Sequence, residues 1–107
     1  MARQLLTDFE LMVLLAILRV GADAYGVPIA REIERTAGRA VAVPGLYVAL
    51  DRLERRGAVR SRIGEPTPIR GGRAKRVFAV TPEGLTAIKQ TKHAFVALWT
   101  GLPELQH

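Results

Sequence analysis

Residues 44–63, PGLYVALDRLERRGAVRSRI, contain the pattern that decides the fold of this chain. Three leucines spaced four and three residues apart form an apolar stripe on a helix predicted from about Pro44 to Arg56. They are Leu46, Leu50 and Leu53. Gly57 is expected to close this helix, and residues 58–63 then alternate in the manner of a strand. The stretch therefore predicts a helix that leads directly into a β-strand.

A return strand completes a predicted hairpin. The loop Gly64–Ala74 contains two prolines and the pair Gly71-Gly72, which are typical turn residues. The second strand is expected over about Lys75–Val80, with Phe78 and Val80 facing inward. On the first strand the residues that share one face are Val59, Ser61 and Ile63.

A strongly apolar helix is predicted near the start of the chain. Thr7 and Glu10 have the T-x-x-E spacing of a capping box, and Gly21 ends the apolar run. Nearly every residue from 9 to 18 is apolar, so this helix is expected to be buried on all sides. Because one small core rarely encloses a helix, we expect a second chain to cover part of it. The candidate interface residues here are Leu11 and Leu14.

A second helix is predicted from about Gly26 to Ala37. Pro28 fits its first turn, where the missing N–H costs nothing, and Gly38 is expected to cap its C-terminus. The expected inner face consists of Val27, Ile29, Ala30 and Ile33.

The last predicted helix opens at Thr81-Pro82-Glu83 and ends near Pro103. Its apolar residues recur at spacings of three and four, which approximates a heptad seam. These residues are Leu85, Ile88, Phe95, Trp99 and Leu102. Such a helix either folds back on its own core or pairs across a dimer, and we favour the dimer.

Three helices, a hairpin and a final helix are the elements of a winged helix-turn-helix with an added terminal helix. The predicted fold class is therefore mainly α with a small β-hairpin. The length of 107 residues is enough for one core only. We assign residues 1–80 to a winged helix-turn-helix DNA-binding domain and 81–107 to a C-terminal dimerisation helix.

The positive charge lies in one block. From Arg55 to Arg76 there are eight basic residues and one acidic residue, net +7, whereas the rest of the chain has eight basic and nine acidic residues, net −1. By itself such a block suits a solvated surface as well as a polyanion. It covers the end of the third helix and the hairpin, however, which are the elements that touch DNA in a winged helix.

Candidate DNA contacts come from these two elements. On the third helix, the face opposite the leucine stripe carries Val48, Asp51, Arg52 and Arg55, and Tyr47 lies at the edge of the stripe. In the hairpin the candidates are Arg70, Arg73, Lys75 and Arg76. A partly basic helix face of this kind fits a major groove.

The sequence offers little for other chemistry. There is no Cys, the two histidines are His93 and His107, and no cluster suits acid–base or nucleophilic catalysis. We therefore expect no enzyme activity, no catalytic residue, no metal and no cofactor. The longest apolar run, Leu11–Leu18, is too short for a membrane span, and the first residues lack a leader pattern. The expected location is the cytoplasm.

Several segments together resemble the PadR family of bacterial transcriptional regulators, over roughly residues 5–100. They are Leu6–Glu10, Asp23–Gly26, Leu46–Glu54, Gly64–Pro68, Gly71–Arg76 and Thr81–Gly84. The resemblance implies a winged-helix homodimer, usually a repressor, that binds an inverted-repeat operator. The single terminal helix is similar to the short-tailed branch of the family.

The resemblance also implies roles for single residues. The hydroxyl of Tyr47 would reach a DNA phosphate, and a small flat aromatic effector could bind near Trp99 at the dimer interface. Ala42 departs from the family pattern, because relatives often carry Ser or Thr there.

Two alternatives remain open at this point. A winged helix can serve as a protein–protein interaction module without specific DNA binding, in which case the basic block is incidental. RNA binding is the other, although the chain lacks the aromatic residues that stack bases on an exposed sheet.

Overall fold

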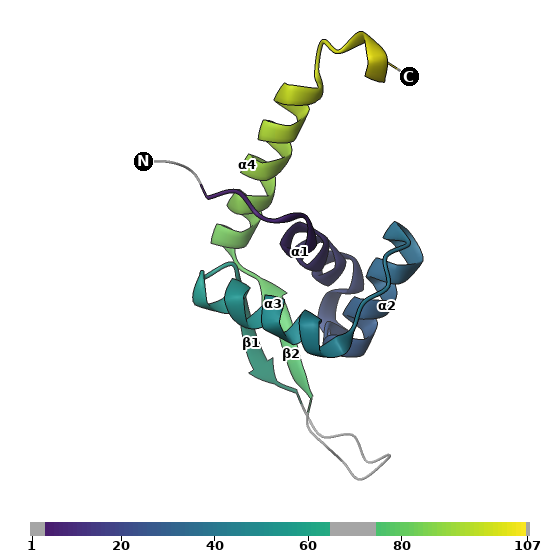
Figure 1. Ribbon diagram of the computed structural model, residues 1–107. Coiled ribbons are helices and arrows are strands. Elements are labelled where there is room, and N and C mark those ends of the chain that lie inside the picture. Colours follow the sequence, from purple (N-terminus) through teal and green to yellow (C-terminus); the bar gives the residue numbers. More distant parts are fainter. Residues whose placement is uncertain (1–3, 65–74, 107) are drawn as a thin grey trace.

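The helices and strands of the computed structural model, which describes residues 4–64 and 75–106, follow the predicted order (Figure 1). The helices are α1 (Asp8–Val20), α2 (Gly26–Ala37), α3 (Val43–Arg55) and α4 (Pro82–Trp99), and the strands are β1 (Val59–Ile63) and β2 (Arg76–Val80). Short 3₁₀ turns span Gly21–Asp23 and Pro103–Leu105. The structure confirms a mainly helical fold with one hairpin.

Local signals explain where the helices begin. The hydroxyl of Thr7 accepts a hydrogen bond from the backbone N–H of Glu10 (3.1 Å), and the Glu10 carboxylate accepts one from the N–H of Thr7 (2.8 Å). This is the predicted capping box of α1. At the start of α4 the hydroxyl of Thr81 accepts a single capping hydrogen bond from the N–H of Gly84 (3.0 Å). Gly38 ends α2 in the left-handed conformation, with φ of +70°.

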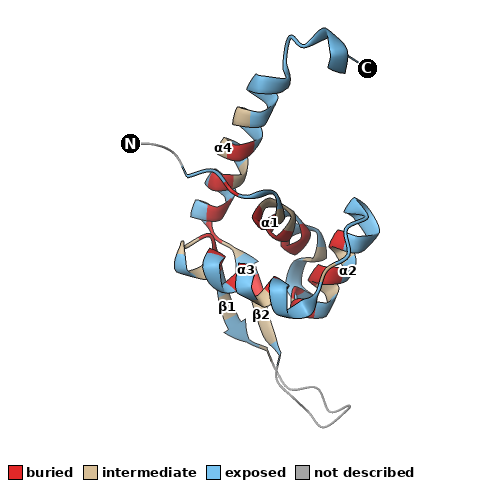
Figure 2. Cartoon of the chain, viewed as in Figure 1, coloured by how far each residue is buried: buried red, intermediate tan, exposed pale blue. Residues whose placement is uncertain are grey.

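The core lies between α1, α2 and α3, with the hairpin covering its lower edge (Figure 2). The three leucines of the α3 stripe are all fully buried, as predicted, and Phe78 from β2 joins them. Two residues expected on inner faces are exposed instead, Val27 at 42% and Ile63 at 68%. Val27 lies in the first turn of α2 and Ile63 is the last residue of β1, so both lie beyond the edge of the core.

The hairpin is antiparallel and is fastened to the helical body. Its register runs from Val59 opposite Val80 to Ile63 opposite Arg76. The N–H of Phe78 donates to the carbonyl of Ala24 (2.8 Å), which ties β2 to the connection between α1 and α2.

Only the first half of α4 packs on the body. Gly84, Ala87 and Thr91 are buried, and a Cβ built on Gly84 would lie 2.1 Å from the carbonyl oxygen of Ala58. Beyond Thr91 the helix projects away from the body, on the side opposite the hairpin (Figures 1 and 2). In this chain α4 is thus not folded back on its own core. The helix also ends at Trp99, four residues before the predicted stop at Pro103.

The segment before α1 joins α3 to α4. Leu6 is buried, and its N–H donates to the hydroxyl of Thr91 (3.1 Å). The guanidinium of Arg56, which follows α3, donates to the carbonyl of Gln4 and lies 3.9 Å from the carboxylate of Glu10. None of the helices described is long and apolar enough to cross a membrane.

Candidate nucleic-acid interface

One face of α3 is open to solvent. Val48 is 56% exposed, and Asp51, Arg52 and Arg55 are exposed as well, because the leucine stripe turns the opposite face into the core. These four are the residues that the sequence placed on the outer face. They are available to a ligand that approaches α3 from outside.

The first turns of α3 carry no charge. Ala42 is the N-cap residue, and Val43, Pro44 and Gly45 follow it, all exposed. Ala42 has no side-chain oxygen, so it cannot cap α3 in the way that Thr7 caps α1. The charged residues begin only at Asp51, two turns into the helix.

Tyr47 is wedged between α2 and the hairpin. It is half-buried, and its ring lies 6.3 Å from that of Phe78, centroid to centroid, at an angle of 60°. A Cβ built on Gly26 would lie only 2.8 Å from the Tyr47 hydroxyl oxygen. The hydroxyl therefore lies against the first residue of α2, where backbone N–H groups of a helix start attract anions.

Arg76 joins α3 to the hairpin. Its guanidinium donates to the carboxylate of Asp51 (3.1 Å), to that of Glu54 and to the hydroxyl of Ser61 (3.1 Å). Glu54 in turn accepts from the N–H and the hydroxyl of Ser61, at 3.2 and 2.8 Å. The guanidinium also lies 4.9 Å from the centre of the Phe78 ring. We call Asp51, Glu54, Ser61 and Arg76 the α3–hairpin clamp.

The clamp shifts the acidity of its members. Hydrogen bonds from Ser61, and then the charge and hydrogen bond of Arg76, lower the pKa of Glu54 despite its partial burial. Burial disfavours the charged form of Arg76, but the carboxylates of Asp51 and Glu54 outweigh it and raise its pKa. Arg76 is thus engaged by two acids within the chain. A direct contact of Arg76 with DNA would require it to share or leave these partners.

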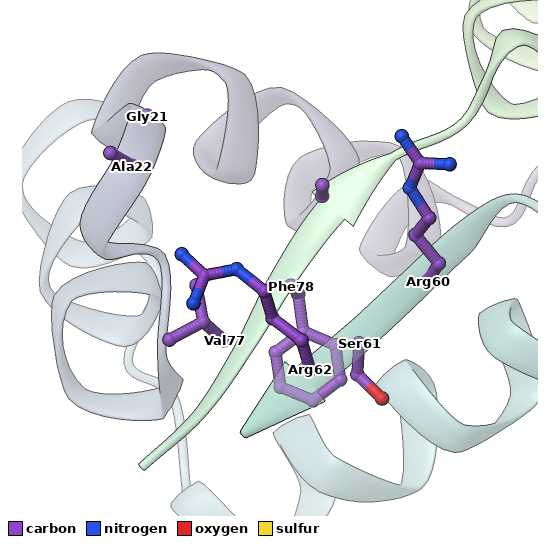
Figure 3. A pocket seen from close by; sticks show the side chains of 8 residues that line it. Gly21, Ala22, Arg60, Ser61, Arg62, Val77 and Phe78 are labelled. Carbon is purple, nitrogen blue, oxygen red and sulfur yellow. The ribbon is translucent and has the colours of Figure 1, made fainter. Parts of the chain in front are cut away.

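The outer face of the hairpin carries two arginines of the basic block that are not among the predicted DNA contacts. Arg60 and Arg62 alternate with Ser61 and lie on the opposite face, where they line a hollow with Gly21 and Ala22 (Figure 3). The alternation of β1 already separates these two faces in the sequence, but only the tertiary structure shows that the outer face is open.

Of the remaining predicted DNA contacts in the hairpin, the structure describes one. The ammonium of Lys75 lies 4.0 Å from the centre of the Tyr25 ring, a cation–π contact at the base of the hairpin. Arg70 and Arg73 lie outside the described residues. Within the described part of the chain, no group of three or more His, Cys, Asp and Glu side chains could hold a metal ion.

The predicted dimer-interface residues differ in how far they are exposed. Leu85, Phe95, Trp99 and Leu102 are exposed, between 40% and 60%, whereas Leu11 and Ile88 are half-buried against the core. Leu14 is fully buried within its own chain, so its prediction as an interface residue is wrong. Its surface is covered because it points from α1 into the core. The large apolar residues of α1 that remain exposed are Leu15 and Leu18, at 41% and 48%.

Comparison with known proteins identifies the family. The model of the transcriptional regulator PadR-like family matches residues 14–90, which is more than half of the chain. A search of curated proteins found no match.

Solved structures share the fold. A transcriptional regulator from Clostridium thermocellum aligns with a TM-score of 0.70 at 22% identity, covering 89% of this chain and 92% of that one. A PadR-like regulator from Bacillus cereus gives 0.71 at 16% identity, covering 91% and 89%. A PadR family regulator from Clostridium difficile gives 0.68 at 18% identity, covering 87% and 92%. The chain belongs to the PadR-like family, and it is therefore a DNA-binding transcriptional regulator and not an enzyme.

Proposed function

We propose that this chain binds an inverted-repeat operator as a homodimer and acts as a repressor. The observation that carries the proposal is that the exposed face of α3 and the hairpin, held together by the α3–hairpin clamp, carry the basic side chains. Arg52 and Arg55 are exposed on α3, and Lys75 stands at the base of the hairpin. Residues 1–80 would bind DNA and 81–107 would join two chains.

The exposed half of α4 supports the dimer. Phe95, Leu98 and Trp99 are 55%, 78% and 60% exposed, and such a large apolar surface on a projecting helix is typical of an interaction site. A second copy of the chain would cover it and would hold two α3 helices at a set separation. Two-fold symmetry then requires an inverted repeat whose half-sites lie about one helical turn, or a multiple of it, apart.

The test is selection from a random duplex library, followed by affinity measurements at several salt concentrations. We expect enrichment of an inverted repeat. Arg52→Ala and Arg55→Ala should each reduce the log–log salt slope by about 0.9 if the side chain contacts a phosphate. Lys89→Ala is the matched control, since it removes one exposed charge from α4, which contributes none of the predicted DNA contacts.

Other outcomes would contradict the proposal. Weak binding that is insensitive to sequence, with the same slope in all variants, would favour a protein–protein interaction module. Transcription from a promoter that contains the selected operator should fall when the protein is added. A rise would contradict the repressor role alone.

We also propose a small, flat aromatic effector beside Trp99 at the dimer interface. The support is the exposed indole on a seam that a second chain would close into a pocket. Trp99 is the only tryptophan of the chain, so its fluorescence reports binding directly. Planar dyes should quench it at the concentrations that change operator affinity, and quenching without any change in affinity would remove the effector role.

A further inference from the structure

The exposed N-terminal part of α3 is apolar. Val43 and Val48 are 42% and 56% exposed, and Pro44 and Gly45 between them are exposed too. None of these four side chains carries a hydrogen-bond donor or acceptor. We call Val43, Pro44, Gly45 and Val48 the leading face of α3.

The polar residues of α3 stand farther along the helix. Val48 and Arg55 are seven residues apart, which is about 10 Å along the axis. Asp51 lies between them, and its carboxylate is held by Arg76 at 3.1 Å. In a helix-turn-helix the first residues of the recognition helix contact base edges. Base edges would therefore meet the leading face, while Arg52 and Arg55 lie nearer the backbone.

Gly45 makes a close approach possible. A Cβ built on Gly45 would meet nothing within 4 Å inside the chain, so the fold does not require glycine there. Its helical backbone does not require glycine either, since its φ is not positive. The missing side chain leaves room for a partner beside Val48, and a base pair fits this requirement.

We propose that the leading face reads the 5-methyl groups of thymines, with Val48 as the residue that determines specificity. Thymine is the base that presents a methyl group in the major groove, whereas the other edges present donors and acceptors. A donor or acceptor on a base edge would lose its water against Val48 and gain no hydrogen-bond partner in return. This unsatisfied group lowers the affinity. The leading face thus favours A·T pairs and disfavours G·C pairs at the same positions. This inference rests on the proposed function.

The test removes single methyl groups from the DNA. Each thymine of the selected operator is replaced in turn by deoxyuridine, and the dissociation constants are measured by fluorescence anisotropy. Burial of one methyl corresponds to about a fourfold change in affinity. We expect a loss of about this size at one or two thymines in each half-site, and no loss at thymines outside the half-sites.

Protein variants assign the effect to Val48. In Val48→Ala the deoxyuridine penalty should disappear at the contacted thymine, whereas Val48→Thr, which retains one γ-methyl, should keep part of it. Val27→Ala is the matched control, because Val27 is as exposed as Val43 but lies on α2. Thermal unfolding shows whether each variant is folded, and the exposed position of Val48 predicts little change there.

The outcomes separate this inference from the proposed function. A selection that enriches no sequence overturns specific DNA binding and this readout together. An enriched operator that tolerates deoxyuridine at every position overturns the readout alone. The same holds if the penalty persists unchanged in Val48→Ala.

Discussion

Replacing Phe95 and Trp99 together by alanine should convert the proposed homodimer into a folded monomer. Both side chains lie beyond Thr91, the last buried residue of α4, and neither belongs to the buried core. The residues that attach α4 to the core are Gly84, Ala87 and Thr91, which the double change leaves intact. The variant should therefore keep its helical circular dichroism.

The expected size follows from the exposed fractions. Trp99 is 60% exposed and Phe95 is 55% exposed. With about 250 and 200 Å² for the two whole residues, roughly 150 and 110 Å² per chain remain in water. Two chains would bury about 500 Å², worth about 13 kcal/mol as an upper bound at about 25 cal/mol per Å². The cost of association is of similar size, about 4–15 kcal/mol, so the dimer should not survive the change.

Light scattering at micromolar concentration measures the result directly. The wild-type chain should have twice the mass of the variant, and the variant should lose tight binding to the full operator. Lys89→Ala with His93→Ala is the matched control, because it removes two exposed polar side chains from the same helix.

Three results would refute this reasoning. A variant that remains dimeric would place the interface elsewhere. A variant that unfolds would mean that Phe95 and Trp99 support the core of their own chain. A wild-type monomer that binds one half-site tightly would remove the need for a dimer.

Three other predictions concern the body of the molecule. Gly84→Ala should lower the free energy of unfolding by about 1–3 kcal/mol in urea titrations, because its Cβ would lie 2.1 Å from the Ala58 carbonyl oxygen; unchanged stability would contradict this close approach. Arg76→Ala should cost about 1–2 kcal/mol through loss of the clamp and of the Phe78 contact. Arg76→Lys, which keeps the charge but not the planar fork, should weaken DNA binding without a change in salt slope; a rescue by lysine would make Arg76 a phosphate contact. The clamp lowers the pKa of Glu54 in the folded chain below its value of 4.5 in the unfolded chain. The ionised Glu54 therefore stabilises the fold fully at a pH above 4.5, and this contribution is lost as the pH falls through the pKa of the folded chain. The stability difference between wild type and Glu54→Gln should therefore shrink on acidification, and a difference independent of pH would exclude this link.

Much of the fold could be predicted because its signals are local. The capping box of Thr7 and Glu10 acts within one helical turn, and the spacing of the α3 leucines describes one side of one helix. The predicted bounds of α2 agree with the structure, and those of α3 differ by one residue at each end. The outer face of α3 could be predicted as well, since it follows from the stripe by rotation about the helix axis.

The tertiary structure decided what covers each face. The apolar pattern of the sequence marks Leu14 and Trp99 alike as interface residues, yet Leu14 lies in the core and Trp99 is exposed to solvent. In the sequence Arg76 is one more residue of the basic block. In the structure it donates hydrogen bonds to Asp51 and Glu54, which lie 25 and 22 positions earlier in the chain. Periodicity states which side chains share a face, because it depends on the geometry of one element. Neighbours across elements depend on how the elements pack, and in this structure the packing directs the Arg76 guanidinium toward Asp51 and Glu54 of α3.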